Sequence, residues 1–196
     1  MEIDDRIKAY SERFPRYSPL IVHNQSIYGF WLTGWRYGKR VPGFYGAYQG
    51  DILERIESLF PDCSPVLHLF SGTVEPGPDR IRYDSVADHS PDICADVMSM
   101  VDYRDIIVKC PLVIADPPYD PSDCVRYGCR PVNKKRVIDV LYECTLPGTF
   151  LCWLDTRVPM YSKAKWTFRG NIGVRGSTQH RIRAWSIFER VGGIDV

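Results

Sequence analysis

The chain has 196 residues, a formal net charge of +1 and a hydrophobic content of 44%, which is ordinary for one globular domain. No apolar run approaches the roughly 18 residues that a membrane span needs, and the charged start "MEIDDRIKAYSERF" has no apolar signal region. Seven scattered cysteines show no zinc-type spacing and suit a reducing compartment. We therefore expect one cytoplasmic domain over residues 1–196, without a metal site or contact with a membrane.

The elements follow in chain order. Residues 1–48, rich in aromatic residues and glycine, are expected to form an extension of short strands and loops. Asp51 is expected to cap a helix over 52–60, whose apolar residues have helical spacing until Pro61 ends it. Further predicted elements are strands at 65–70, 80–84, 110–115, 149–155, 165–172 and 182–190, and a helix at 134–145. This alternation predicts an α/β fold: a mostly parallel sheet, covered on both faces, with a terminal antiparallel strand pair.

The stretch "VIADPPYD" at 113–120 has the clearest chemical content. Its apolar start is typical of a buried parallel strand. Pro117 and Pro118 end that strand, since neither can donate a backbone hydrogen bond. Asp116 and Tyr119 are therefore presented on a stiff turn at the carboxyl edge of the sheet, where open α/β sheets bind ligands.

Three other strand ends supply polar features for the same edge. Ser71-Gly72-Thr73 follows the strand "VLHLF", and glycine allows a ligand to approach the backbone closely. Asp84 closes the strand "RIRYD" and could accept hydrogen bonds from ribose hydroxyls, while Asp96 in "ICADVM" could accept one from an adenine amino group. The phosphate-binding patterns GxGxxG and GxxxxGK[ST] are absent, which argues against NAD and ATP.

Together "HLFSGT", "YD", "ADV" and "ADPPY" resemble the ordered motifs of the S-adenosylmethionine-dependent amino-methyltransferases that act on adenine N6 or cytosine N4. The resemblance covers about residues 42–190 and implies a Rossmann-like methyltransferase fold. It implies that Asp116 and the carbonyl of Pro117, on the turn with Pro118, bind the target amino group while Tyr119 stacks on the target base. It also implies a cofactor site formed by Phe70, Ser71, Gly72, Asp84, Asp96 and Val97.

The chain departs from this family in three places. Val74 stands where the first motif usually has a second glycine, and His68 stands where many members have an acid. Both changes are expected to weaken cofactor binding or to move the methionine end of the cofactor. No long target-recognition region is present, and the stretch between Tyr119 and Lys134 is expected to be only a loop.

A basic stretch near the C-terminus is the candidate nucleic-acid surface. From Arg157 to Arg190 there are eight Lys or Arg residues against Glu189 alone, which suggests an anionic partner or a solvated basic face. The candidate phosphate contacts are Lys163, Lys165, Arg169, Arg175, Arg181 and Arg183. Trp166, Phe168 and Asn171 are candidates beside the base. If the basic stretch is only solvated, the aromatic segment near Trp31, Trp35 and Arg36 becomes the alternative surface.

The predicted chemistry is methylation of an exocyclic amino nitrogen, with adenine N6 in DNA as first choice. That nitrogen is a poor nucleophile, and accepting its two protons would direct its lone pair at the methyl group while stabilising the developing positive charge. The base would have to be flipped out or unpaired. Two alternatives stay open: an RNA base methyltransferase, and a non-catalytic subunit that binds cofactor or nucleic acid. The sequence does not fix the oligomeric state.

Overall fold

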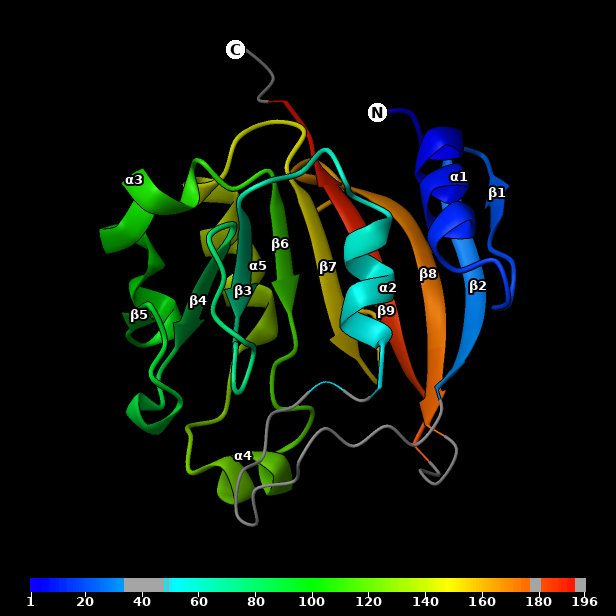
Figure 1. The fold of residues 1–196 in the computed structure, drawn as a ribbon. Helices are drawn as coiled ribbons and strands as arrows, with labels where there is room; N and C mark the ends of the chain where they lie inside the picture. Colours follow the sequence, from blue (N-terminus) through cyan, green and yellow to red (C-terminus); the bar gives the residue numbers. More distant parts are fainter. Residues whose placement is uncertain (34–47, 49, 177–180, 193–196) are drawn as a thin grey trace.

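The computed structural model describes residues 1–33, 48, 50–176 and 181–192. In these residues one sheet has the strand order β1-β2-β8-β9-β7-β6-β3-β4-β5 (Figure 1). The strands are β1 (Ile21–His23), β2 (Ser26–Thr33), β3 (Val66–Leu69), β4 (Arg80–Asp84), β5 (Ile93–Cys94), β6 (Leu112–Ala115), β7 (Phe150–Asp155), β8 (Trp166–Gly176) and β9 (Arg183–Arg190). The α-helices are α1 (Ile3–Arg13), α2 (Ile52–Ser58), α3 (Arg104–Ile107), α4 (Pro121–Tyr127) and α5 (Lys134–Cys144), and the 3₁₀ helices are η1 (Ala87–His89) and η2 (Val97–Tyr103).

The strand directions confirm the predicted fold class. β4, β3, β6 and β7 run parallel to one another, and β9 lies antiparallel between β7 and β8. This is a mostly parallel α/β sheet with a terminal antiparallel pair, as expected for a Rossmann-like methyltransferase fold. The carboxyl ends of the parallel strands all meet at one edge of the sheet, the lower edge in Figure 1.

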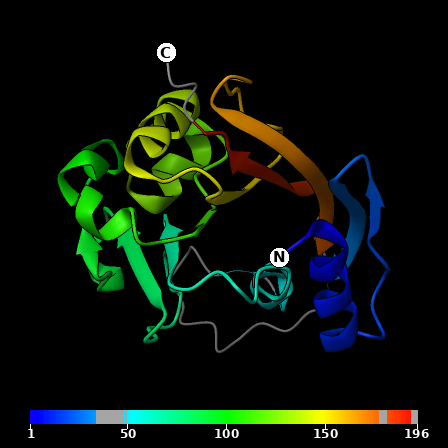
Figure 2. The same ribbon diagram turned by 90° about the horizontal axis from the view of Figure 1, so that it is seen from above.

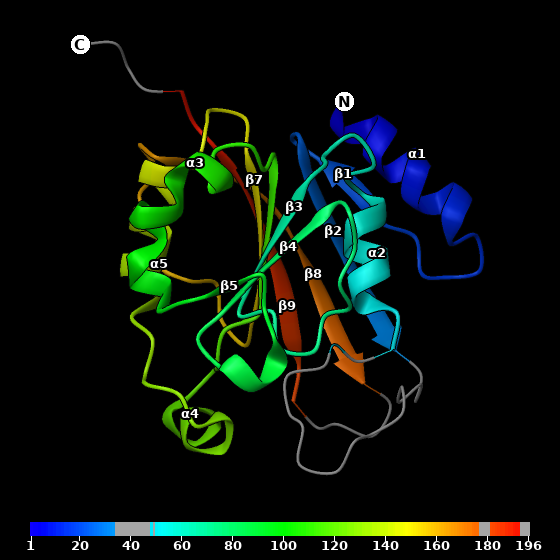
Figure 3. The same cartoon turned by 60° about the vertical axis from the view of Figure 1, so that its left-hand side comes forward.

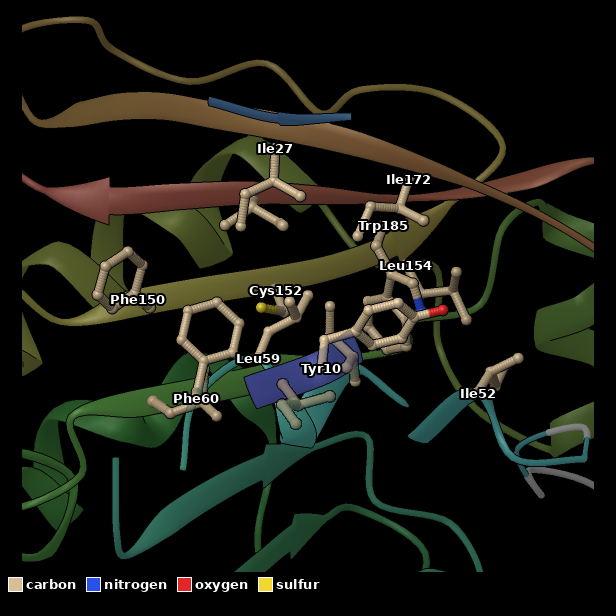
Figure 4. Close-up of a cluster of buried hydrophobic side chains, with 14 of the residues drawn as sticks. Tyr10, Ile27, Ile52, Leu59, Phe60, Phe150, Cys152, Leu154, Ile172 and Trp185 are labelled. Atoms are coloured by element: carbon tan, nitrogen blue, oxygen red, sulfur yellow. The ribbon is translucent and has the colours of Figure 1, made fainter. Parts of the chain in front are cut away.

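Helices cover both faces of the sheet. α1 and α2 lie on one side, and α3 and α5 lie on the other (Figure 3). The apolar residues of α2 pack into a first core cluster, which includes Ile52, Leu59 and Trp185 (Figure 4). Those of α5 pack into a second cluster on the opposite face. Every residue of β7 is buried, which is expected of a central strand covered on both faces.

The N-terminal segment differs from the expectation of short strands and loops. Residues 3–13 form α1, and β2 adds to the sheet in parallel with β8, with β1 at the outer edge (Figure 2). Tyr10 of α1 is buried and stacks on Trp31 of β2 with 5.6 Å between ring centroids. Arg6 is also buried and donates to the carboxylate of Asp62 at 2.7 Å. The segment therefore extends the main sheet and its first core cluster.

Two local predictions were also wrong. Residues 121–127, expected to be loop, form α4, because the Asp120 side chain accepts a hydrogen bond from the Asp123 amide and Pro121 occupies the first turn. Asp51 precedes α2 as predicted but makes no capping hydrogen bond, because its carboxylate pairs with Arg55 at 3.0 Å. No helix in the described part of the chain is long and apolar enough to cross a membrane.

Candidate active site at the carboxyl edge of the sheet

A pocket opens where β3, β4 and β6 end. Seven of the residues that line it were predicted as site residues: Phe70, Gly72, Asp84, Asp116, Pro117, Pro118 and Tyr119. Five other lining residues were not predicted from the sequence: Ser85, Val86, His89, Tyr127 and Cys129. Ser85 and Val86 directly follow Asp84, so their position after a strand-ending acid could have indicated them. The pocket brings the glycine turn, the acid of β4 and the DPPY turn into one site.

The turn after β3 is tied to the acid that ends β4. The Gly72 amide donates to Asp84 Oδ2 at 2.8 Å, and the Val86 amide donates to Asp84 Oδ1 at 2.9 Å. Phe70 and Gly72 have φ angles of 56° and 51°, a left-handed conformation that Gly72 adopts without steric cost. Because a carboxylate has about four acceptor positions, Asp84 keeps acceptor capacity for a ligand.

Three of the predicted cofactor residues do not line this pocket. Ser71 is buried, and its amide donates to the carbonyl of Tyr83. The Asp96 carboxylate caps η2 by accepting from the Met98 amide at 2.8 Å, while its carbonyl accepts from the Tyr83 hydroxyl at 2.7 Å. Asp96 and Val97 thus lie where β5 passes into η2, with the acid of Asp96 used as a helix cap.

The DPPY turn holds a short hydrogen-bonded chain. The Tyr119 hydroxyl donates to Asp116 Oδ1 at 2.5 Å, and Arg183 Nη1 donates to the Tyr119 oxygen at 3.3 Å. Burial raises the pKa of Asp116 to about 6, against the opposing effects of the Arg183 charge and the hydrogen bond from Tyr119. Burial, followed by the Asp116 charge, raises the pKa of Tyr119 well above its usual range.

A partly buried ion pair supports this turn. Lys134, the first residue of α5, donates to the carbonyl of Tyr119 at 3.0 Å and pairs with Asp155 at 2.5 Å. Asp155 ends β7 and is buried, and it also accepts from the Thr156 amide at 2.6 Å. Sequence reasoning missed this pair, although the acid at the end of "TFLCWLD" follows the same strand-end pattern as Asp116.

The basic residues do not gather into one surface. Lys163 and Lys165 precede β8 and therefore lie at the opposite edge from the pocket. Lys165 pairs with Asp139 and Arg169 with Glu189. Arg181 pairs with both Asp120 and Asp123 beside Tyr119. Arg183 is buried and contacts the DPPY turn through Tyr119. Lys163 and Arg175 are exposed.

The aromatic candidates for the base are also placed elsewhere. Trp166 is buried in the second core cluster, and Phe168 packs on Phe188 with 5.6 Å between ring centroids. The Asn171 side chain donates to the Ser186 hydroxyl at 3.2 Å. None of the three lines the pocket, because β8 is separated from β6 by two other strands. Of the alternative segment, Trp31 is buried, while Trp35 and Arg36 lie outside the described residues.

The two unusual motif positions point into the protein. His68 is fully buried, and burial lowers the pKa of its imidazole to about 3, so the ring is neutral although Glu57 lies 3.6 Å away. Val74 is buried, and its amide donates to the Ser71 carbonyl at 3.0 Å, which closes the turn. Neither residue is part of the pocket lining, so a valine in place of glycine at position 74 leaves the lining described above intact.

Comparison with known proteins shows no family, and the structural likenesses it gives include two distant ones. No family model matches the chain, and no curated protein matches it. TrmN from Thermus thermophilus shares 14% identity over 65% of this chain and 44% of its own, with a TM-score of 0.45. The N-methyltransferase NodS from Bradyrhizobium japonicum WM9 shares 10% identity over 66% of this chain and 86% of its own, with a TM-score of 0.43. Both TM-scores are below 0.5, so neither likeness defines a function for this chain.

Proposed function

We propose that this protein transfers a methyl group from S-adenosylmethionine to the exocyclic amino group of a nucleobase. One observation carries the proposal: the turn with Gly72 and Asp84 and the turn with Asp116 line the same pocket. A cofactor on the first turn would therefore stand beside an acceptor bound to the second. Adenine N6 in DNA is the first choice of substrate, so the proposed partner is nucleic acid.

The residues at the first turn fit this cofactor. When bound, S-adenosylmethionine supplies a methyl group attached to a positively charged sulfur. Asp84 has acceptor positions left for ribose hydroxyls, and Gly72 carries no side chain that would keep a ligand from the backbone. Phe70 and Val86 add apolar surface to the lining, which suits an adenine ring.

The DPPY turn would bind and activate the amino group. Asp116 Oδ1 is occupied by Tyr119, but within the described residues Oδ2 accepts no hydrogen bond. Oδ2 and the carbonyl of Pro117 are the proposed acceptors for the two amino protons. Because the pKa of Asp116 is about 6, the carboxylate is mostly ionised near neutral pH and can stabilise the positive charge that develops on nitrogen.

The Tyr119 ring remains the proposed stacking face for the base. Its hydroxyl is held by Asp116, and the Arg181 guanidinium lies 5.7 Å from the ring centroid. An aromatic ring fixed in this way could receive an unpaired base on its free area without further ordering of its own side chain. The same arrangement would serve an adenine or cytosine in DNA or a base in RNA.

The decisive experiment supplies methyl-labelled cofactor with duplex DNA, single-stranded DNA or RNA, and then identifies the labelled nucleoside after digestion. Labelled N6-methyladenosine from RNA, or N4-methylcytosine, would change the substrate from adenine in DNA but would keep the proposed transfer to an exocyclic amino group. A protein that binds cofactor but labels none of the three polymers would instead be a non-catalytic subunit, and the proposal would be wrong.

A variant ties the activity to the site. Asp116→Ala should reduce methyl transfer by about 10²–10³-fold, while cofactor affinity measured by calorimetry stays close to that of the unchanged protein. Asp116→Asn should also be severely impaired because it lacks the charge. Asp102→Asn, which alters an exposed carboxylate on η2, is the matched control and should remain active. An active Asp116→Ala protein would refute the mechanism.

A further inference from the structure

Arg183 is not available to a nucleic-acid backbone, although it belongs to the basic stretch near the C-terminus. It begins β9, where residues alternate between the two faces of the sheet, and it shares a face with Trp185 and Ile187 of the first core cluster. Only 7% of its surface is exposed. A buried guanidinium needs a reason other than solvation, because burying an unpaired charge is costly.

We infer that Arg183 is a positioning residue for methyl transfer, which holds Asp116 in its working orientation through the hydroxyl of Tyr119. This inference rests on the proposed function. The contacts run from Arg183 Nη1 to the Tyr119 oxygen at 3.3 Å and from that hydroxyl to Asp116 Oδ1 at 2.5 Å.

The chemistry of the three groups fixes which atom donates in each of these two hydrogen bonds. A guanidinium has donors only and keeps its proton at all relevant pH values. The Tyr119 oxygen must therefore accept from Arg183, which leaves its proton for Asp116. With the Tyr119 proton on Oδ1, Oδ2 is the oxygen left for the amino group of the substrate. Arg183 thus sets which oxygen of Asp116 does the chemistry without touching the substrate.

Arg183 also supplies a favourable charge near Asp116. Burial, Asp155 on β7 and Asp123 on α4 all raise the pKa of this carboxyl, whereas Arg183 lowers it. Lys134 is nearby but pairs with Asp155. Among the described residues, the groups that interact electrostatically with this carboxyl include Arg183, Tyr119, Asp155, Asp123 and Tyr48. Removing Arg183 would therefore leave a buried acid among acids and phenols, which protonates at a higher pH.

The first test measures the Asp116 carboxyl directly, by NMR titration of protein labelled with ¹³C-aspartate and assigned by comparison with Asp116→Asn. We expect Arg183→Gln to raise the titration midpoint by at least about one pH unit, with no shift in Arg175→Gln, the control at an exposed arginine of β8. An unchanged midpoint in Arg183→Gln would overturn the inference. Because the titration needs neither cofactor nor substrate, absence of methyl transfer in the unchanged protein would count against the proposed function alone.

The second test uses variants that keep the buried charge, in case Arg183→Gln fails to fold. Arg183→Lys should lower kcat about tenfold and move the acid limb of the pH profile upward, because a lysine lacks the rigid fork that reaches the hydroxyl. KM for the polymer and the salt dependence of binding should not change. If Arg183 acts through Tyr119, then Arg183→Lys should have less than about a twofold effect in a Tyr119→Phe background. Equal effects in both backgrounds, or a flattened salt dependence, would contradict the inference.

Discussion

The hydroxyl of Tyr119 and the carboxylate of Asp116 are joined by a 2.5 Å hydrogen bond within the turn that ends β6. The tyrosine is therefore more than an aromatic surface for a base, since it donates to the acid that is proposed to activate the amino group. A donor to the ionised form stabilises that form and lowers the pKa of Asp116 against the effect of burial.

Replacing the hydroxyl should make the reaction more sensitive to acid. Methyl transfer requires ionised Asp116, so activity falls as the pH drops through the pKa of about 6. Tyr119→Phe removes one donor, which raises this pKa and moves the acid limb of kcat upward by about one pH unit. Well above the limb the Tyr119→Phe variant should show about the tenfold loss of kcat expected for Arg183→Lys, because both lose the contact that orients Asp116, whereas Tyr119→Ala should lose far more activity throughout. Superimposable acid limbs for the unchanged protein and the Tyr119→Phe variant would contradict this prediction.

Two strand-end acids should behave differently toward the cofactor. Asp84 lines the pocket, so Asp84→Ala should weaken binding of S-adenosylmethionine by roughly 10–100-fold in calorimetry, as expected for loss of a charged hydrogen-bond acceptor. Asp96→Ala should leave the affinity nearly unchanged, because that carboxylate caps η2 and does not line the pocket. Circular dichroism on both variants checks the fold. Equal losses of affinity would show that the cofactor reaches η2.

The exposed cations should differ in their effect on nucleic-acid binding. Arg175 lies near the carboxyl end of β8, on the side of the sheet edge that holds the pocket, whereas Lys163 lies before the start of β8 at the other edge. If Arg175 contacts a phosphate, Arg175→Ala should flatten the dependence of log K on log salt by about 0.9 on duplex DNA. Lys163→Ala should leave the slope as it is. The reverse result would place the polymer along the opposite edge.

A glycine fixes the junction between the N-terminal strands and the rest of the sheet. Gly170 has a φ of 130° at an irregularity in β8, and an added Cβ would stand 1.9 Å from the carbonyl oxygen of Ile27. Gly170→Ala should therefore lower the free energy of unfolding by roughly 3 kcal/mol. Gly148→Ala is the matched control: its φ is 83° but the space around it is open, so about 1 kcal/mol is expected. Denaturant titration compares the two, and similar losses would contradict the steric argument.

Much of the sheet could be predicted because its strands are short apolar runs that end at acids or prolines. The expected strand at 80–84 coincides with β4, and the helix expected at 134–145 differs from α5 by one residue. The same strand-end logic correctly brought Gly72, Asp84 and Asp116 to one pocket. Parallel strands place their carboxyl ends at a common edge, so the order of motifs along the chain is enough to predict their meeting.

Where the predictions differ from the structure, the sequence pattern was weak or the outcome depended on tertiary packing. α1 is mostly polar, so it was not predicted, although Ile3, Ile7 and Tyr10 have the spacing of one helix face. The cofactor role of Asp96 stays a prediction, since the structure shows only that its carboxylate caps the adjacent η2 and does not line the pocket. Arg183 was assigned to phosphate binding from the local charge alone. Its alternation with Trp185 would have placed it on the covered face of β9.

The pairing of β2 with β8 has a consequence for the order in which the chain acquires its structure. Ile27 pairs with Gly170, so one edge of β2 has no sheet partner until the strands that follow it have nearly all left the ribosome. β3, β4, β6 and β7 pair with one another and depend on no earlier strand. During synthesis the central strands can assemble first, whereas β2 waits with an open edge for a strand made much later. A strand that is synthesised early is thus among the last to be fixed in the sheet.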